Sequence, residues 1–296
     1  MDVLSPRSTE LGGFTIRRLL PQRPRRMVGA WCFLDLLGPV PVGAGRGLDV
    51  PPHPHIGLQT VTWVLEGEAL HKDSLGSEAV ARPGTLNLMT SGAGIAHSEE
   101  TPATASGVLH LVQLWIAQPD ADRNGPPAFD HHAERPVYEA RNGRATVVLG
   151  ALGGVDAPAR TFSPLVAAEL AVDRGGELVL PLDRGFEHAV VPLAGALAVA
   201  GTPLALEHLR FLEAGRDSVA LRAEGGPARA LLIGGAPFAE SILMWWNFVA
   251  RTTDEIVAAR DDWQAGRRFG EVRAYAGERL PAPRFLARPV PANPMS

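Results

Sequence analysis

The sequence predicts an all-β protein made of two similar β-barrels, with one helix near the C-terminus. Short apolar runs such as "LQTVTWVLEG", "VLHLVQLWIA" and "HAVVPLAGALAVAG" recur along the chain. The 32 glycines and 26 prolines fall largely between such runs, where they favour tight turns. Many short strands joined by tight turns are typical of a sandwich or barrel.

Polar composition divides the chain into parts. Residues 1–120 and 137–240 are strand-rich, and we expect one barrel in each. Between them, residues 121–136 lie within the polar, proline-containing stretch "QPDADRNGPPAFDHHAERP" and form the expected linker. Residues 241–296 hold the helix and end in the proline-rich "ERLPAPRFLARPVPANP", which we expect to be extended over the surface.

One helix is predicted, over residues 252–266, "TTDEIVAARDDWQAG". Its apolar residues Ile256, Ala259 and Trp263 recur at near-helical spacing. A threonine at its start can cap the first turn, and Gly266 can end the last one.

Composition excludes several classes of partner. The chain has 296 residues, of which 46% are hydrophobic and 20% charged, so it can form one or two domains with well-formed cores. Its net charge of -4 gives no general attraction to nucleic acid or to an anionic membrane. The basic stretch "RRLLPQRPRR" contains no interleaved aromatic residue, which argues against nucleic-acid binding. We therefore expect a small-molecule partner.

Cysteine usage and hydropathy indicate the compartment. Cys32 is the single cysteine, so the chain can form no internal disulfide and no cysteine-rich zinc site. The first 20 residues lack the basic start and apolar run of a secretory signal, and no apolar run of 18 residues follows. A cytoplasmic location and no membrane association are expected.

The stretch "PPHPHIGLQTV" contains the first candidate metal ligands. His53 and His55 are two positions apart, so in a strand their imidazoles point to the same face. His97 and Glu99, in "SGAGIAHSEE", repeat that spacing. Two such pairs facing each other inside a barrel offer three nitrogens and one oxygen. This set suits Fe(II), Mn(II), Ni(II), Cu(II) or Zn(II), and not Ca or Mg.

The second half carries no comparable set. "TVTWVLEGEALH" and "HAVVPLAGALAVAG" are both a strand, a glycine turn and a strand, which suggests two copies of one barrel. His188 and His208 have no ligand residue two positions away, so the second copy is predicted to hold no metal.

Each feature also has a structural interpretation without function. A single His-x-His pair is more often hydrogen-bonded or exposed than metal-bound, and the second pair is what favours the metal. We expect the remaining aromatic and histidine candidates to serve structure or solvent contact: His71 and His110 near strands, His131 and His132 in the linker, and Trp245 and Trp246 in packing.

Five motifs together resemble the pirin family of the cupin superfamily: "RRMVGAWCFLDLLGP", "HPHIGLQTVTWVLEGEALHKDSLG", "RPGTLNLMTSGAGIAHSEE", "LVQLWI" and "NFVARTTDEI". The resemblance implies two cupin domains, with metal in the N-terminal one and none in the C-terminal one. It implies that the C-terminal helix packs back near the N-terminal domain. The family's ligands fall on His53, His55, His97 and Glu99, and the associated metal is iron, so that one Fe(II) is expected.

Two residues depart from the family pattern. Gln59 stands where pirins and cupins generally have glutamate, and Thr85 stands where "RPGD" is usual. The carboxylate ligand comes from the Glu99 position, so Gln59 should not abolish metal binding. An amide carries no negative charge to orient a histidine. This loss of charge can shift the redox potential of the metal or the substrate preference.

The resemblance implies two classes of function. One is an oxygenase similar to quercetin 2,3-dioxygenase, which cleaves a flavonol or another enolic compound and uses Glu99 as both ligand and general base. The alternative is a non-catalytic protein that senses metal or redox state and binds another protein. An open coordination position favours the enzyme, although fold similarity alone does not fix function.

Overall fold

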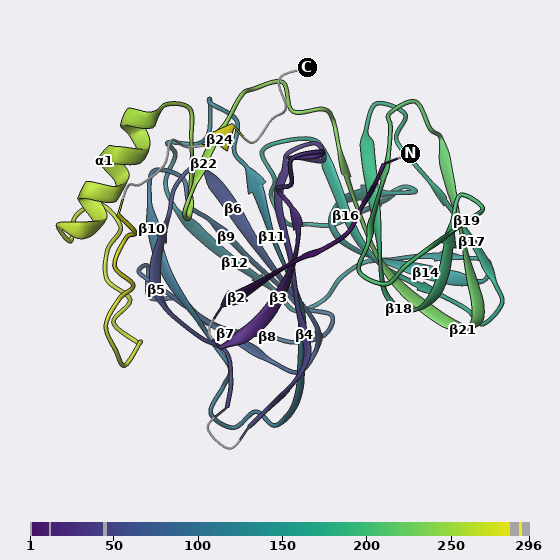
Figure 1. The fold of residues 1–296 in the computed structure, drawn as a ribbon, viewed down its shortest axis with the longest axis horizontal. Coiled ribbons are helices and arrows are strands. Elements are labelled where there is room, and N and C mark those ends of the chain that lie inside the picture. Colours follow the sequence, from purple (N-terminus) through teal and green to yellow (C-terminus); the bar gives the residue numbers. More distant parts are fainter. Residues whose placement is uncertain (1, 12, 44–45, 285–289, 292–296) are drawn as a thin grey trace. The chain divides into compact units, whose positions relative to one another are not determined.

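The computed structural model describes residues 2–11, 13–43, 46–284 and 290–291. These residues form mostly β-strands, with one α-helix near the C-terminus, which confirms the predicted fold class (Figure 1). The chain divides into two compact units. We call residues 8–16, 33–133 and 240–296 the N-terminal barrel unit, and residues 1–7, 17–32 and 134–239 the C-terminal barrel unit.

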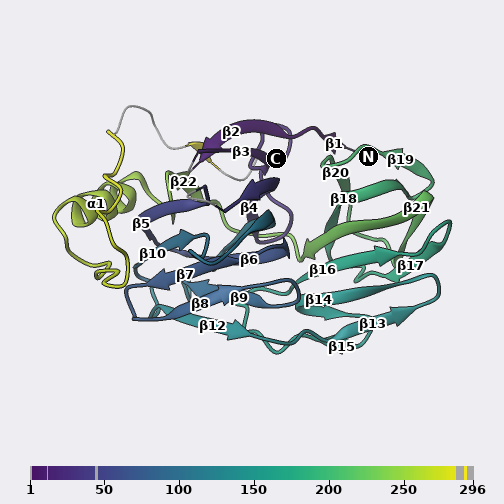
Figure 2. The ribbon, with the colours of Figure 1, turned by 90° about the horizontal axis from the view of Figure 1, so that it is seen from below.

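Three sheets hold the strands of the N-terminal barrel unit, and three of these strands also include residues assigned to the other unit: 7, 17–20 and 31–32 (Figure 2). A seven-stranded sheet has the order β12-β9-β6-β11-β4-β3-β2, a four-stranded sheet the order β5-β10-β7-β8, and a three-stranded sheet the order β23-β22-β24. The strands are β2 (Arg7–Leu11), β3 (Phe14–Leu20), β4 (Trp31–Val42), β5 (Asp49–His55), β6 (Leu58–Glu66), β7 (Ala69–Asp73), β8 (Glu78–Ala81), β9 (Leu86–Thr90), β10 (Ile95–Glu100), β11 (Gly107–Ala117), β12 (Ala128–His132), β22 (Leu243–Trp245), β23 (Phe248–Ala250) and β24 (Val290–Pro291).

The core of this unit joins its two larger sheets. Val50 of β5 and Ala69 of β7, from the four-stranded sheet, pack in one cluster with Val64 of β6 and with Leu109 and Leu111 of β11, from the seven-stranded sheet. Each valine or leucine side chain of this cluster contributes roughly 1.5–3 kcal/mol when it is fully buried. One face of the four-stranded sheet is therefore buried against the seven-stranded sheet. A register shift of one residue would expose these apolar side chains, so the burial determines the register.

One sheet of ten strands makes up the C-terminal barrel unit. Its path is β1-β20-β18-β21-β16-β14-β13, with β15 paired to β14, β17 to β21 and β19 to β18. The strands are β1 (Val3–Leu4), β13 (Val137–Ala140), β14 (Gly143–Leu152), β15 (Val155–Asp156), β16 (Leu165–Val172), β17 (Glu177–Pro181), β18 (Glu187–Val199), β19 (Thr202–Leu204), β20 (Leu209–Leu212) and β21 (Ser218–Gly235). Its interior is a continuous aliphatic cluster that includes Leu170, Leu178 and Val190.

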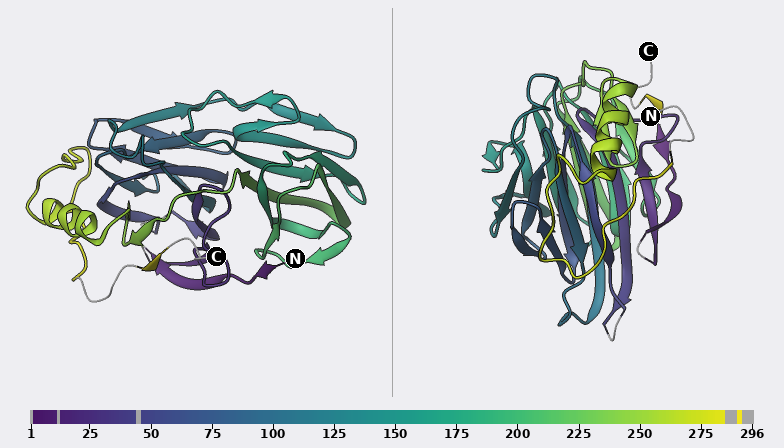
Figure 3. Two further views of the ribbon diagram at one scale, coloured as in Figure 1. Left: turned by 90° about the horizontal axis from the view of Figure 1, so that it is seen from above. Right: turned by 90° about the vertical axis from the view of Figure 1, so that its left-hand side faces the viewer.

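The helix α1 (Thr253–Gln264) lies where the sequence predicts it. The Thr252 hydroxyl accepts a hydrogen bond from the Glu255 amide, and the Glu255 carboxylate accepts one from the Thr252 amide, which together form a capping box. Trp263 and the other buried residues of the helix pack in one cluster with Ile56 and Ala96. The helix thus packs beside the ends of the strands that carry the histidine pairs. Figure 3 shows the helix, in yellow-green, next to the blue strands of this unit.

The expected linker contains a strand, and the proline-rich tail is described only in part. The strand β12 forms inside residues 121–136, the range expected to be a linker, and it pairs with β9 at the edge of the seven-stranded sheet. Of the proline-rich tail, residues 285–289 and 292–296 lie outside the described residues. Within the described part of the chain, no helix combines the length and hydropathy needed to cross a bilayer.

Candidate metal centre

Two neighbouring strands of the four-stranded sheet bring the candidate ligands together. β5 and β10 are antiparallel, and His97 is the direct partner of His53 in their register. His55 lies two positions further along β5, on the same face. The two histidine-bearing strands are thus adjacent in one sheet, and do not face each other across the barrel as the sequence analysis expected.

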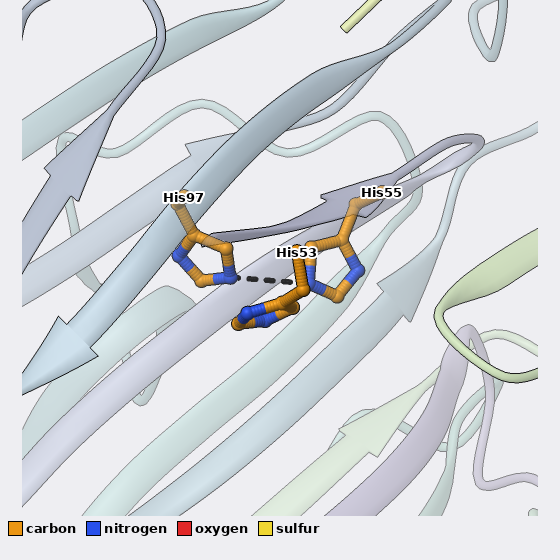
Figure 4. Close-up of side chains that lie close together, drawn as sticks. All are labelled: His53, His55 and His97. Carbon is orange, nitrogen blue, oxygen red and sulfur yellow. Dashed lines mark hydrogen bonds between the residues drawn. The ribbon is translucent and has the colours of Figure 1, made fainter. Parts of the chain in front are cut away.

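The three imidazoles converge at one point (Figure 4). Their ligand nitrogens all lie within 4.8 Å of one another, and Nε2 of His55 is 3.1 Å from Nε2 of His97. The side chains are almost fully buried, with exposed fractions of 6% for His53 and 1% for His55 and for His97. Among the described residues, this is the one group of three or more ligand-type side chains that could hold a metal ion.

Burial keeps the three rings uncharged at neutral pH. It lowers the pKa of His53 to about 4, although the Pro51 carbonyl opposes the shift. Burial is also the main cause that holds the pKa values of His55 and His97 well below 6.5, and repulsion from His53 adds to it. A neutral imidazole has one lone pair, which is what a metal requires.

Backbone carbonyls determine which nitrogen of two rings carries that lone pair. Nδ1 of His53 is 2.9 Å from the carbonyl oxygen of Pro51, and Nδ1 of His55 is 3.1 Å from that of Asn247. A carbonyl only accepts, so each Nδ1 donates its proton and leaves the lone pair on Nε2. This arrangement fits the usual environment of metal-binding histidines, whose second nitrogen donates to a carbonyl or carboxylate.

Glu99 is placed differently from the three histidines. The β5–β10 register shifts between His97 and Glu99, so that Glu99 pairs with Val50. Between these paired positions β5 has one residue more than β10, and both of its unpaired residues are prolines, Pro51 and Pro52, which donate no ladder hydrogen bond. The group of three histidines does not include Glu99.

The Glu99 carboxylate has its own polar contact. It accepts a hydrogen bond of 3.3 Å from the Thr62 hydroxyl. Burial raises its pKa to about 7, against the opposing effect of that hydrogen bond, although part of the side chain remains exposed. A carboxyl group with this pKa can both hold and release a proton near neutral pH.

The neighbouring strand β7 supplies two residues that the sequence analysis did not assign to the site. Nδ1 of His71 is 3.2 Å from Nδ1 of His97, and Nε2 of His71 is 3.1 Å from Oδ2 of Asp73. Both side chains are buried. His71 and Asp73 are also two positions apart in "LHKDSLG", and this repeat of the ligand spacing was the signal available in the sequence.

The two residues that depart from the pirin pattern have structural partners. The Gln59 side chain is buried in β6 and donates to the Thr90 hydroxyl at 2.9 Å. The Thr85 hydroxyl accepts from the Arg82 amide at 2.8 Å and closes the turn before β9, which is a bond that an aspartate could also form.

A hairpin from the C-terminal segment borders the site. β22 and β23 enclose Trp246 and Asn247, and the Val249 amide donates to the Ile56 carbonyl at 3.1 Å. Trp245 and Trp246 contact Phe248, so both serve aromatic packing as expected. Trp246 has a φ of 52°, a left-handed conformation that is rare for a bulky residue. This hairpin presents the Asn247 carbonyl to His55.

Comparison with known proteins assigns the chain to a family. The sequence profile described as Pirin matches residues 13–116, and the profile described as Pirin C-terminal cupin domain matches residues 167–270. The chain belongs to the pirin family. This pirin therefore has two cupin domains, one in each half of the sequence, which confirms what the resemblance implied.

Relatives of this pirin include proteins with enzyme names. A Pseudomonas aeruginosa protein named "Putative quercetin 2,3-dioxygenase" is 49% identical over 95% of this chain and 89% of its own length. A pirin-like protein of Caulobacter vibrioides is 36% identical over 90% of this chain and 93% of its own. A crystal structure of quercetin 2,3-dioxygenase from Acinetobacter baumannii covers 99% of this chain and 98% of its own, with 44% identity and a TM-score of 0.94.

Proposed function

We propose that this pirin binds one divalent transition-metal ion through Nε2 of His53, His55 and His97, with Glu99 as a fourth ligand, and acts as an oxygenase on flavonols or other enolic compounds. Iron(II) is the metal we propose, and manganese, nickel, copper and zinc fit the same donor set. The names of the relatives support the reaction class.

The observation that carries the proposal is the convergence of three buried, neutral imidazoles. Burying three polar rings is unfavourable unless their nitrogens find partners. The Nδ1 atoms of His53 and His55 already have carbonyl partners, and their Nε2 atoms point to a common centre. A cation at that centre would satisfy the Nε2 lone pairs together.

Glu99 fits the role of general base. The bound metal would supply an electron-poor centre that lowers the proton affinity of an enolic hydroxyl. In the metal-free site the pKa of Glu99 is about 7, and the Thr62 hydroxyl holds the carboxylate in place. A bound cation would lower the proton affinity of Glu99, so the carboxylate would accept the hydroxyl proton once substrate binding displaces or loosens it from the metal. Because Gln59 is an amide, the neighbouring strand β6 offers no carboxylate at that position.

Metal analysis followed by a turnover assay tests the proposal. Protein expressed with iron and purified without oxygen should contain about one metal ion per chain. Oxygen consumption with quercetin as substrate should depend on that metal and stop when a chelator removes it. Metal-free protein under all loading conditions would overturn the proposal.

A second function is favoured by one specific contact. The carbonyl acceptor for His55 belongs to Asn247, in the hairpin of residues 243–250. As the alternative, we propose that metal occupancy is linked to the position of that hairpin through this contact, as a protein that senses metal and reports it to a protein partner would require. Metal-loaded protein that consumes no flavonol, together with metal-dependent hydrogen exchange in residues 243–250, would favour the sensing role.

A further inference from the structure

The contact between His55 and His97 has two chemical interpretations. Their Nε2 atoms lie 3.1 Å apart, a distance that suits a hydrogen bond. If His97 carries its proton on Nε2, it donates to His55 and the pair is satisfied without any metal. If His97 carries its proton on Nδ1, two lone pairs face each other and only a cation between them is favourable. The Asn247 carbonyl fixes the tautomer of His55. The tautomer of His97 therefore determines whether the two rings form a hydrogen bond or a cation site.

Asp73 and His71 determine that tautomer. An ionised carboxylate only accepts hydrogen bonds, so Nε2 of His71 donates to Oδ2 of Asp73. A His71 ring that carries one proton, on Nε2, has its lone pair on Nδ1. Since this atom faces Nδ1 of His97 at 3.2 Å, His97 must donate from Nδ1. Nε2 of His97 is left with a lone pair.

We call the hydrogen bonds that run from Asp73 through His71 to His97 the relay. The surrounding residues hold the relay in one geometry. His71 and Asp73 are 4% and 3% exposed. The ring of His71 stacks on Phe129, with centroids 4.2 Å apart and an interplanar angle of 10°. Oδ1 of Asp73 accepts hydrogen bonds from the amides of Leu75 at 2.9 Å and Ser77 at 3.0 Å, which leaves Oδ2 for His71.

The charge of Asp73 agrees with the direction of the relay. Burial acts to raise its pKa, but the hydrogen bonds from His71 and Ser77 outweigh burial and hold the pKa below its usual value. The carboxylate is therefore ionised at neutral pH and can only accept.

We propose that Asp73 and His71 are positioning residues that fix the Nδ1–H tautomer of His97, and thereby convert a hydrogen-bonded histidine pair into a metal site. This inference rests on the proposed metal-binding function. It adds two residues that do not touch the metal. The carboxylate of Asp73 determines whether His55 and His97 form a hydrogen-bonded pair or a metal site.

The variant Asp73→Asn tests the relay by changing a single atom. The amide oxygen can keep the hydrogen bonds to Leu75 and Ser77, which places the NH₂ group opposite Nε2 of His71. That NH₂ donates, so the His71 proton moves to Nδ1 and His97 must accept there. Nε2 of His97 then carries a proton and donates to His55. We expect metal affinity to fall by about 10–100-fold.

The tautomer can be read without any metal. In metal-free protein labelled with ¹⁵N at histidine, ¹H–¹⁵N correlations assign the protonated nitrogen of each ring. We expect His97 to be protonated at Nδ1 in the wild type and at Nε2 in Asp73→Asn. Affinity for Zn(II) is measured in parallel by competition with a chromophoric chelator.

Two further variants separate the relay from general damage. Asp183→Asn is the matched control, because Asp183 also accepts a hydrogen bond at Oδ1 from an amide two residues on, that of Gly185, in the C-terminal barrel unit. It should leave Zn(II) affinity unchanged. His71→Phe removes the middle of the relay, so it should itself weaken Zn(II) binding, and adding Asp73→Asn to it should cause little further loss.

The outcomes are distinguishable. The relay is refuted if Asp73→Asn keeps His97 protonated at Nδ1 and binds Zn(II) within about two-fold of wild type, or if Asp73→Asn costs as much in the His71→Phe background as alone. Wild type that binds no transition metal would refute the proposed function, while the NMR comparison would still decide the tautomers. If Asp73→Asn does not fold, undiminished Zn(II) affinity in His71→Phe overturns the relay.

Discussion

His97 is the direct partner of His53 across the β5–β10 pair, and the centroids of their rings are 4.4 Å apart. Cross-strand partners keep this separation only in one register, because a shift by one residue would turn every side chain of the strand to the other face. The geometry of the candidate metal centre is therefore a property of the sheet as well as of the histidines.

The first prediction concerns the ligands. His97→Ala should lose most of the bound metal, because two imidazoles remain where three converge. Elemental analysis of protein expressed with iron measures the change. The control is the double variant His188→Ala, His208→Ala, which changes histidines of the C-terminal barrel unit and should keep about one ion per chain. Full metal content in His97→Ala, or loss in the control, would contradict the assignment.

The second prediction concerns the base. Glu99→Gln keeps the shape of the side chain and cannot accept a proton. At equal metal occupancy, flavonol consumption should fall by about 10²–10⁴-fold, the usual effect of losing a general base. Oxygen uptake with quercetin is the measurement. Turnover within a few-fold of wild type would mean that the base lies elsewhere.

The third prediction concerns the hairpin that contacts His55. Gly57 has a φ of 67°, and a Cβ atom there would lie 2.2 Å from the Val249 carbonyl oxygen. Gly57→Ala should push residues 243–250 away, so that metal affinity falls and hydrogen exchange in this segment rises. Gly84 has a φ of 84° with open space around it, so Gly84→Ala is a control with the same backbone cost, about 1–2 kcal/mol. Equal losses of metal affinity in both variants would mean that the position of the hairpin does not affect metal binding.

The fourth prediction concerns stability at acid pH. Burial lowers the pKa of His188 to about 4, whereas an unfolded chain has an ordinary histidine pKa near 6.5. Between these values the unfolded state binds more protons, so stability falls as pH falls from about 6.5 to 4. The loss due to this residue is at most about 3.4 kcal/mol. In denaturant titrations of metal-free protein, His188→Gln should show a shallower acid decline, and parallel curves would contradict the assignment.

Some of the site could be predicted from the sequence. The i, i+2 spacing places His53 and His55 on one face regardless of the rest of the fold, and the structure brings His97 to them. The sequence does not state that β5 and β10 are adjacent, nor that Pro51 and Pro52 shift the register before Glu99. Strand pairing depends on the whole sheet, which a local pattern does not contain.

Other parts of the site left weaker signals. His71 and Asp73 have the same spacing as the ligand pairs, but only the pairing of β7 with β10 brings them beside His97. The Asn247 carbonyl left no signal, because any residue has a carbonyl and the turn at Trp246 is one that sequence rules assign to glycine. β12 is short and mostly exposed, so its sequence resembles that of a linker.

The hydrogen bond from His55 to Asn247 spans 192 residues of chain. During synthesis, at about 5–20 residues per second, Asn247 leaves the ribosome roughly 10–40 seconds after His55. Until then the His55 ring has no Asn247 carbonyl to fix its proton on Nδ1, and the proton can occupy either ring nitrogen. All four candidate ligands precede residue 100. The carbonyl that fixes the His55 tautomer is therefore synthesised long after the candidate ligands themselves.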